Sequence, residues 1–164
     1  MGKKTAFKIE YMKKEDVDQV LAIEQASFSM PWSKNLFLSE FRSPAISTLM
    51  VSLDDKPTRT ILGYIVFWTA AREMHILNLA VSPEFRKQGI SRTLVHSALQ
   101  EAYRKGAQRA FLEVRASNIA AQRLYSGMGF TGISMRKDYY DSPVEDAIIM
   151  SLEPQAFLRI VQHH

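Results

Sequence analysis

The chain has 164 residues, of which 46% are apolar and 23% charged, with 21 lysines and arginines against 17 aspartates and glutamates. This length predicts a single domain over residues 1–164, and the composition excludes an intrinsically disordered chain. The lack of cysteine excludes disulfides, a thiolate nucleophile and a cysteine-ligated zinc site. Because no apolar run approaches the roughly 18 residues of a membrane span, we expect no membrane association.

The charge pattern does not favour a nucleic-acid partner. The formal net charge is +4, but the basic residues are scattered as pairs such as Lys3-Lys4 and Arg136-Lys137, which is typical of a solvated surface. The basic start of the chain is not followed by an apolar segment, so we expect no secretory signal and a cytoplasmic protein. The final His163-His164 resembles the remnant of a purification tag.

The first half of the chain predicts a strand, two helices and three more strands. Apolar residues alternate with polar ones over 7–11, and they follow helical spacing from Val17 to Phe28. Ser33 is a typical N-cap for a short second helix through Phe41, which Pro44 closes. The three strand-like stretches that follow are 46–53, 61–70 and 74–82.

The second half predicts helices alternating with strands. A polar loop after the strand ending at Ser82-Pro83 leads into a helix that ends at Gly106. The further elements are a strand at 109–114, a helix at 119–128, and a closing pair of strands at 131–137 and 145–152. The predicted order is therefore βααβββαβαββ, a mixed α/β fold around one central sheet.

The loop between the 74–82 strand and the helix after it has the features of an anion site. Its sequence is Arg86-Lys87-Gln88-Gly89-Ile90-Ser91, and the first N–H groups of a helix are unpaired and favour an anion. Gly89 would let the backbone approach a pyrophosphate closely, while Arg86, Lys87 and Arg92 add positive charge. Any strand-to-helix turn also needs a small residue, so the glycine alone does not decide between the two roles.

This loop resembles the Arg/Gln-x-x-Gly-x-Gly/Ala signature of the GCN5-related N-acetyltransferase (GNAT) superfamily, and the element order agrees over nearly the whole chain. Three more stretches are similar to the RimI-like ribosomal-protein-alanine N-acetyltransferases within it. They are Phe28-Ser29-Met30-Pro31-Trp32-Ser33, Leu112-Glu113-Val114-Arg115-Ala116-Ser117-Asn118, and Tyr139-Tyr140 with Glu145-Asp146-Ala147-Ile148-Ile149-Met150. Two positions depart from the pattern, namely Ser91 for the last Gly/Ala and Asp138 for the usual Asn before the tyrosine pair.

The resemblance implies a GNAT fold with helices on both faces of a mostly antiparallel sheet. It also implies that acetyl-CoA lies in a gap between the strands at 74–82 and 109–114, without a metal. The diphosphate would lie on the loop and the start of the helix after it, and the pantetheine arm on the end of the preceding strand. The residues implied in cofactor binding are Leu79, Ala80, Val81, Arg86, Lys87, Gln88, Gly89, Ile90, Ser91, Arg92 and Asn118. Asn118 is also a typical N-cap for the helix that follows.

Glu113 is a charged residue in the apolar strand Phe111-Leu112-Glu113-Val114, which we expect to be covered on both faces. One explanation is an ion pair with Arg115, two positions on and therefore on the same face. The other is base catalysis on an amine, the role that the resemblance implies for Glu113. Glu73 and His75 are a third possibility for the base, although their place at a strand end suggests exposure to solvent.

Tyr125 lies two helical turns after Asn118, so both side chains point the same way. The resemblance implies that its phenol protonates the departing CoA thiolate, while packing of the helix against the sheet is the alternative. Trp32, Tyr139 and Tyr140 would line a groove for the substrate peptide, or serve as ordinary packing residues.

The implied function is direct transfer of an acetyl group from acetyl-CoA to the N-terminal amine of a protein, an alanine of a small-subunit ribosomal protein. No acyl-enzyme is expected, because the chain has no cysteine and no Gly-x-Ser-x-Gly elbow. The alternatives are acetylation of a small-molecule amine or a lysine side chain, a non-catalytic module that binds acyl-CoA, and an RNA-binding protein.

Overall fold

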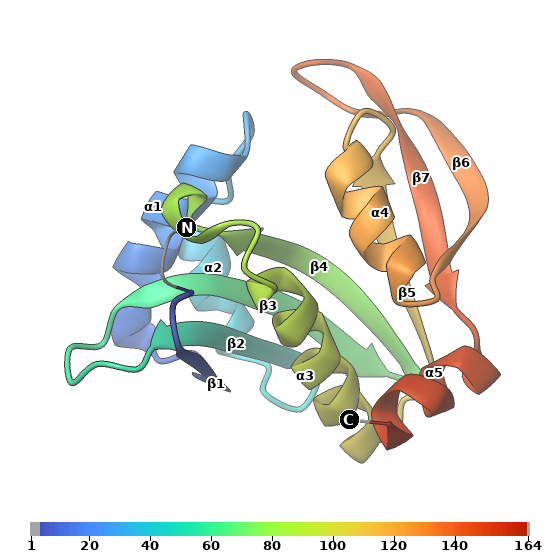
Figure 1. Ribbon diagram of the computed structural model, residues 1–164. Coiled ribbons are helices and arrows are strands. Elements are labelled where there is room, and N and C mark those ends of the chain that lie inside the picture. The colour runs from blue at the N-terminus through green and yellow to red at the C-terminus, as the bar shows by residue number, and fades with distance from the viewer. Residues whose placement is uncertain (1–3, 164) are drawn as a thin grey trace. The chain divides into compact units, whose positions relative to one another are not determined.

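The computed structural model describes residues 4–163 and consists of seven strands, five α-helices and two short 3-10 helices within that range (Figure 1). The strands are β1 (Phe7–Tyr11), β2 (Ser47–Asp54), β3 (Ile61–Ala70), β4 (Glu73–Val81), β5 (Arg109–Arg115), β6 (Thr131–Tyr140) and β7 (Glu145–Leu152). The helices are η1 (Lys14–Asp16), α1 (Val17–Ser27), α2 (Lys34–Glu40), η2 (Pro83–Phe85), α3 (Ile90–Arg104), α4 (Ile119–Gly127) and α5 (Pro154–Gln162).

The predicted order of strands and helices is confirmed up to β7, but the chain adds α5, which the sequence analysis missed. Pro154 occupies the first turn of α5, and Phe157 and Val161 form its buried face. A proline at the first helical position and apolar residues four apart are both helix signals, so the evidence for α5 was present in the sequence.

The strands are hydrogen-bonded in the order β1-β2-β3-β4-β5-β7-β6. The β1–β2, β5–β7 and β7–β6 pairs are antiparallel, whereas β4 and β5 are parallel. The parallel register runs from Glu73↔Arg109 to Ile76↔Leu112. β4 then continues for five residues, Leu77 to Val81, beyond this register. This is the mixed α/β fold that the sequence predicts.

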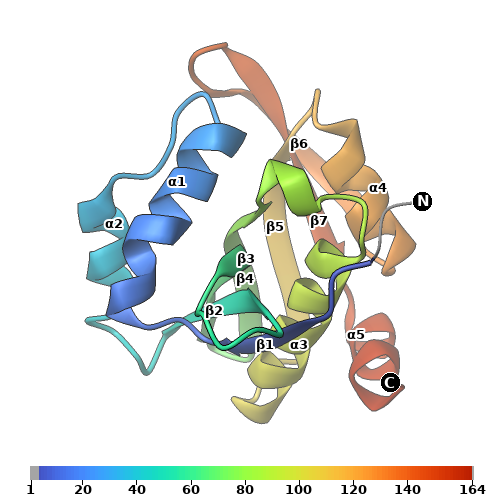
Figure 2. The same ribbon diagram turned by 60° about the vertical axis from the view of Figure 1, so that its left-hand side comes forward.

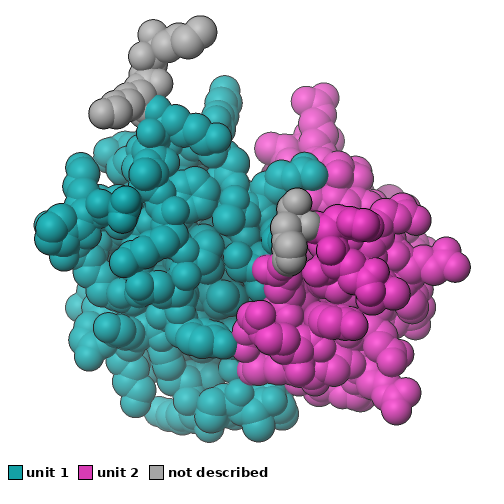
Figure 3. All heavy atoms as spheres, turned by 60° about the horizontal axis from the view of Figure 1, so that its bottom comes forward, with its two compact units in different colours: residues 1–67, 78–98 teal, residues 68–77, 99–164 magenta. Residues whose placement is uncertain are grey.

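The contacts of the chain group its described residues into two compact units (Figure 3). The first comprises residues 4–67 and 78–98, and the second 68–77 and 99–163. The boundary passes through β3, β4 and α3, so both units contain parts of these elements. That the whole chain behaves as one domain stays a prediction.

In the first unit, α1 and α2 lie on one side of the strands and the start of α3 on the other (Figure 2). The eight residues of β2 are all buried, and Tyr64, Ile65 and Phe67 of β3 are inaccessible to solvent. Burial on both faces explains why the sequence of β3 is a long, mostly apolar run. Ser33 caps α2 as expected, its side chain accepting a hydrogen bond from the Leu36 N–H at 3.1 Å.

In the second unit, β5 alternates between buried and half-buried positions. Ala110, Leu112 and Val114 face the core, while Phe111 and Glu113 lie on a face that is partly open to solvent. The expectation that this strand is covered on both faces was therefore wrong. Among residues 4–163, no helix is long and apolar enough to cross a membrane.

Candidate active site

The loop before α3 has the backbone conformation of a tight turn. Lys87 and Gly89 both have positive φ, at 62° and 83°. Glycine adopts such an angle without strain, and a Cβ atom on Gly89 would meet nothing within 4 Å. Gly89 thus favours the conformation of the turn and leaves open space above it. The first N–H groups of α3, which begins at Ile90, have no acceptor inside the helix.

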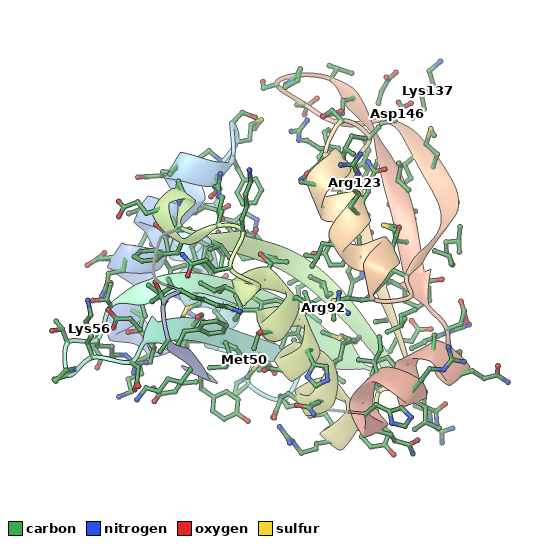
Figure 4. The ribbon with its side chains drawn as sticks, viewed as in Figure 1. Met50, Lys56, Arg92, Arg123, Lys137 and Asp146 are labelled. Atoms are coloured by element: carbon green, nitrogen blue, oxygen red, sulfur yellow. The ribbon has the colours of Figure 1, made fainter. Side chains whose placement is uncertain are left out.

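Two side chains of this loop hold it in place. The Arg86 guanidinium donates to the Val81 carbonyl and to the Ser27 hydroxyl, both at 3.1 Å. The Gln88 side chain accepts a hydrogen bond from the Thr5 N–H at 2.9 Å. Lys87 and Arg92 are exposed, and Arg92 lies on the first turn of α3 (Figure 4). The loop thus presents exposed cations, and N–H groups that have no acceptor inside the helix, on a backbone held by hydrogen bonds, as an anion site requires.

The end of β4 depends on a glycine that the sequence analysis did not single out. A Cβ atom on Gly63 of β3 would lie 2.9 Å from the Ala80 carbonyl oxygen and 3.1–3.2 Å from the side chains of Val81 and Leu94. Only glycine lets β3 approach β4 and α3 this closely. Gly63 thereby fixes the position of the Leu79–Val81 segment predicted to bind the cofactor arm.

A buried carboxylate links three elements of the first unit, α1, β3 and β4, with the segment before α2. Glu24 of α1 is 1% exposed. Its carboxylate accepts hydrogen bonds from the Tyr64 hydroxyl, the Asn78 side-chain amide at 2.8 Å and the Trp32 backbone N–H at 3.0 Å. Glu24 is not among the site residues expected from the sequence, although a charged residue next to Ile23 in the apolar stripe of α1 was the available signal.

This network fixes the segment that contains Trp32. The Trp32 ring packs against Phe37, with centroids 5.1 Å apart, and Phe37 meets the Tyr64 ring edge-on at 5.6 Å. Burial, followed by the neighbouring Glu24, raises the pKa of Tyr64, so its hydroxyl stays a donor. Trp32 is half-buried, which leaves part of its ring available for contact.

In the second unit, Glu113 pairs with a histidine of the adjacent strand. Its Oε2 atom lies 2.7 Å from Nε2 of His75 on β4, and the two side chains are 20% and 39% exposed. The hydrogen bond from His75 lowers the pKa of Glu113 and outweighs burial, which would raise it. Glu113 is consequently ionised throughout the neutral range.

The alternative ion pair between Glu113 and Arg115 is wrong. Arg115 bonds instead to Glu145 at 3.2 Å and to the carbonyls of Asp141 and Pro143. Glu73, at the start of β4, is exposed to solvent as expected, whereas His75 is half-buried. Sequence spacing could not reveal this pair, because its members come together through the β4–β5 register.

The tyrosine pair of β6 lies near this carboxylate. Tyr139 and Tyr140 meet edge-on with centroids 5.0 Å apart, and the Arg115 guanidinium stands 4.4 Å above the Tyr140 ring. Burial and then the charge of Glu113 raise the pKa of Tyr140 to about 12. Tyr140 therefore remains a protonated hydrogen-bond donor beside Glu113, while Tyr139 is exposed.

Tyr125 is buried in α4, at 5% exposure, with its ring edge-on to Phe130 at 5.4 Å. Burial raises its pKa, so the phenol keeps its proton. The packing role considered for Tyr125 is thus confirmed in part, and it does not prevent the hydroxyl from donating. Asn118 caps the same helix as predicted, accepting from the Ala121 N–H at 3.1 Å.

The backbone conformation at position 138 explains why Asp can replace the Asn that is usual before the tyrosine pair. Asp138 has φ of 52°, in the left-handed region that asparagine and aspartate tolerate better than most other residues. The Asp138 N–H donates to the Asp146 carboxylate at 2.9 Å. Asp146 and Lys137 lie together at one end of the β6–β7 pair (Figure 4). Asp therefore meets the same conformational requirement as the Asn it replaces. Nothing in the structure tests the effect of Ser91.

Each unit thus brings together one set of the predicted residues. The first holds the loop, the Leu79–Val81 segment and Trp32, and the second holds Glu113, Tyr125, Asn118 and the tyrosine pair. The described residues include no group of three or more His, Asp or Glu side chains that could hold a metal.

Comparison with known proteins agrees with this arrangement. The model of the acetyltransferase (GNAT) family matches residues 17–130, which include α1 to α4 and β2 to β5. The chain belongs to the GNAT family. GNAT acetyltransferases use acetyl-CoA, and the protein is an N-acetyltransferase.

Individual relatives extend the similarity to nearly the whole chain. The [ribosomal protein bS18]-alanine N-acetyltransferase of Haemophilus ducreyi is 33% identical over 147 residues, which are 88% of this chain and 98% of that protein. The crystal structure of the ribosomal-protein-S18-alanine N-acetyltransferase from Escherichia coli superposes with a TM-score of 0.81 at 29% identity, covering 90% and 94% of the two chains. Ard1 from Thermoplasma volcanium gives 0.80 at 29% identity, covering 89% and 96%.

Proposed function

We propose that this GNAT enzyme acetylates the α-amine of an N-terminal alanine, on the small-subunit ribosomal protein that its relatives modify, in the cytoplasm. The observation that carries the proposal is the 33% identity to a [ribosomal protein bS18]-alanine N-acetyltransferase over nearly all of both chains. The half-buried Glu113 supports it, because an amine substrate must lose a proton before its nitrogen can attack.

The residues of the first unit fit acetyl-CoA. The N–H groups at the start of α3 and the exposed Lys87 and Arg92 suit a diphosphate. Backbone groups of Leu79–Val81 would pair with the pantetheine arm, and an N–H there would polarise the thioester carbonyl. Asn118 of the second unit would hold the arm further along. Acetyl-CoA supplies the activated acetyl group as a thioester.

Glu113 serves as the base for the substrate. An α-ammonium group has a pKa of about 7.7–8.0, so a minor but useful share is already deprotonated at neutral pH. An ionised carboxylate acting directly or through one water removes the remaining proton. A lysine ε-amine, with a pKa of about 10.4, would need a stronger base than a carboxylate whose pKa is lowered. This difference favours the α-amine as substrate.

Tyr125 serves as the acid for the leaving group. Its phenol stays protonated because burial raises its pKa, and it would donate that proton to the CoA thiolate. On the peptide side, Trp32, Tyr139 and Tyr140 offer aromatic surface and hydroxyl donors for an extended N-terminal segment. The Trp32 segment is fixed by Glu24, and the Tyr140 ring by Arg115.

The test is mass spectrometry of a peptide that carries a free N-terminal alanine and an internal lysine, after incubation with the protein and acetyl-CoA. Fragmentation locates the acetyl group, and we expect it on the α-nitrogen alone. Acetyl on the lysine nitrogen would contradict the proposal, and so would an unmodified peptide. A matched peptide that begins with acetyl-alanine serves as the control, because it leaves the lysine as the only amine.

A further inference from the structure

The turn between β6 and β7 is held by the side chain of an arginine at the end of β5. The Arg115 guanidinium donates hydrogen bonds to the carbonyls of Asp141 and Pro143, at 3.0 and 3.1 Å. It also pairs with the Glu145 carboxylate at 3.2 Å and lies over the Tyr140 ring, 4.4 Å from the centroid. A planar guanidinium with its fork of donors can make these contacts together, which a lysine ammonium cannot. Arg115 thus fixes the turn and the tyrosine before it.

Glu145, the first residue of β7, connects this arginine to the segment before α4. Its carboxylate accepts hydrogen bonds from the Ser117 N–H and from the Ser117 hydroxyl, both at 2.9 Å. The Ser117 hydroxyl, followed by its N–H and the Arg115 guanidinium, lowers the pKa of Glu145 more than burial raises it, so the carboxylate is ionised at neutral pH. The next residue, Asn118, donates its own N–H to the Arg115 carbonyl at 2.9 Å. The side chain of Arg115 therefore holds the β6–β7 turn, while its backbone holds Asn118.

The other end of β5 carries a similar pair in a more open setting. Arg109 pairs with Glu153 and lies over the Phe111 ring, 5.5 Å from its centroid. The side chains of Arg109 and Glu153 are 39% and 48% exposed, against 24% and 15% for Arg115 and Glu145. Water screens an exposed pair, so such a pair contributes little to the structure. Arg109 is therefore a matched control for Arg115 on the same strand.

The β6–β7 turn would otherwise have few contacts to hold it. Residues 141–144 are all exposed, and the Val144 side chain projects into solvent at 65% exposure. The turn directly follows Tyr139 and Tyr140, the two tyrosines assigned to the substrate peptide. An exposed segment that becomes ordered only when a ligand binds weakens the binding, because the ordering costs conformational entropy. Contacts that fix the turn beforehand remove this cost, so the affinity for the peptide depends on them.

We propose that Arg115 and Glu145 are positioning residues for the peptide substrate, which fix the β6–β7 turn and hold Tyr140 in the orientation that binds the peptide. Both act through the turn and the tyrosine, so they affect peptide binding rather than acetyl transfer. Asn118 is held by the Arg115 backbone, and a change of the Arg115 side chain therefore leaves the cofactor side in place. This inference rests on the proposed function and deepens it, because it adds residues that determine affinity for the peptide.

The experiment measures kcat, KM for the alanine peptide and KM for acetyl-CoA in the wild type, Arg115→Gln and the control Arg109→Gln. For Arg115→Gln we expect the peptide KM to rise about tenfold, while kcat and the acetyl-CoA KM stay within about twofold, as for a loss of binding that is equal in the ground and transition states. Arg109→Gln should match the wild type in all three quantities.

Glu145→Gln tests the other member of the pair and keeps the experiment available if Arg115→Gln does not fold. The glutamine amide has a single acceptor oxygen for three donors, one from Arg115 and two from Ser117. We therefore expect the peptide KM to rise in the same way, with kcat retained. Thermal unfolding of each variant shows that the protein assayed is folded.

Tyr140→Phe provides a readout that a purely structural role of Arg115 would not move. The substitution removes the hydroxyl and keeps the ring beneath the guanidinium, so in the wild-type background it should raise the peptide KM. In the Arg115→Gln background the same substitution should have little further effect, because the tyrosine is no longer held in place.

The outcomes separate this inference from the proposed function. A wild type that acetylates the peptide, together with an unchanged peptide KM in Arg115→Gln and Glu145→Gln, would overturn this inference alone. Equal rises in both KM values, or independent effects of Arg115→Gln and Tyr140→Phe, would also overturn it. A wild type that does not acetylate the peptide would overturn the proposed function and the inference with it.

Discussion

Glu24 and Glu113 are carboxylates among apolar neighbours, one in each compact unit, and their surroundings differ in kind. Glu24 is almost fully buried and accepts hydrogen bonds from three neutral donors. Glu113 is one-fifth exposed and bonds to an imidazole. A carboxylate whose lone pairs are occupied by fixed neutral donors holds a structure together, whereas an open carboxylate beside a titratable ring is able to exchange protons.

The comparison is tested most strongly by replacing Glu113 with glutamine. The amide keeps the size of the side chain but cannot accept the substrate proton, so we expect kcat to fall by about 10²–10⁴-fold. The loss should be largest at low pH, where free amine is scarce. Thermal unfolding should change little, because the side chain is partly exposed. An unchanged rate of acetyl transfer would remove Glu113 from the mechanism.

Tyr125→Phe sharpens the comparison, because Tyr125 is as buried as a structural residue but is assigned a chemical role. We expect about a 10²-fold fall in kcat with the affinity for acetyl-CoA retained, since the ring packing on Phe130 is preserved. Isothermal titration with acetyl-CoA and steady-state kinetics separate the two effects. Equal losses of affinity and rate would instead indicate a packing role.

Glu24→Gln should have the opposite profile to Glu113→Gln. The amide turns NH₂ hydrogens toward donors, so at least one buried group loses its acceptor. The expected cost is about 2–3 kcal/mol of unfolding free energy, or a fall in Tm of about 4–10 °C. Near room temperature, the kcat of the folded variant should stay within a few-fold of the wild type, while KM for the peptide rises as the Trp32 segment loosens. A fall in kcat as large as that of Glu113→Gln would contradict the purely structural role assigned to Glu24.

Asp16 is a further buried carboxylate that, like Glu24, has a structural role. Removing its partner Arg59 should give the smallest effect of these predictions. Burial raises the pKa of Asp16, but hydrogen bonds from Arg59 and Lys13 outweigh it, and the net pKa is lowered. A lowered pKa in the folded state means that this stabilisation is present at neutral pH and is lost as the pH falls below about 4. The free energy of unfolding, measured with urea from pH 7 to 3, should therefore fall more steeply with pH for the wild type than for Arg59→Gln. Parallel curves would contradict the role of Arg59.

The sequence was sufficient for the order of strands and helices up to β7, because hydrophobic periodicity and caps such as Ser33 and Asn118 are local signals. It also located Glu113 as an unusual charge in an apolar strand. The partner of Glu113 could not be predicted in the same way. His75 reaches Glu113 through the β4–β5 register, whereas Arg115, the partner expected from sequence spacing, bonds to Glu145.

Two further features show where local reasoning fails. Gly63 reads as an ordinary strand residue, and its importance arises from the approach of β4 and α3 to within contact distance. Glu24 stands out only as a charge in the apolar stripe of α1, and its role depends on donors from β3, β4 and the segment before α2. Both depend on long-range contacts, which single-sequence patterns do not encode.

The most direct test of the account is a side-by-side assay of the wild type, Glu113→Gln and Glu24→Gln on the alanine peptide, with the site of acetylation mapped by fragmentation and unfolding followed on the same samples. The account predicts α-nitrogen acetylation by the wild type, nearly complete loss of turnover with unchanged stability in Glu113→Gln, and reduced stability with retained turnover in Glu24→Gln. Full activity of a folded Glu113→Gln would contradict the account.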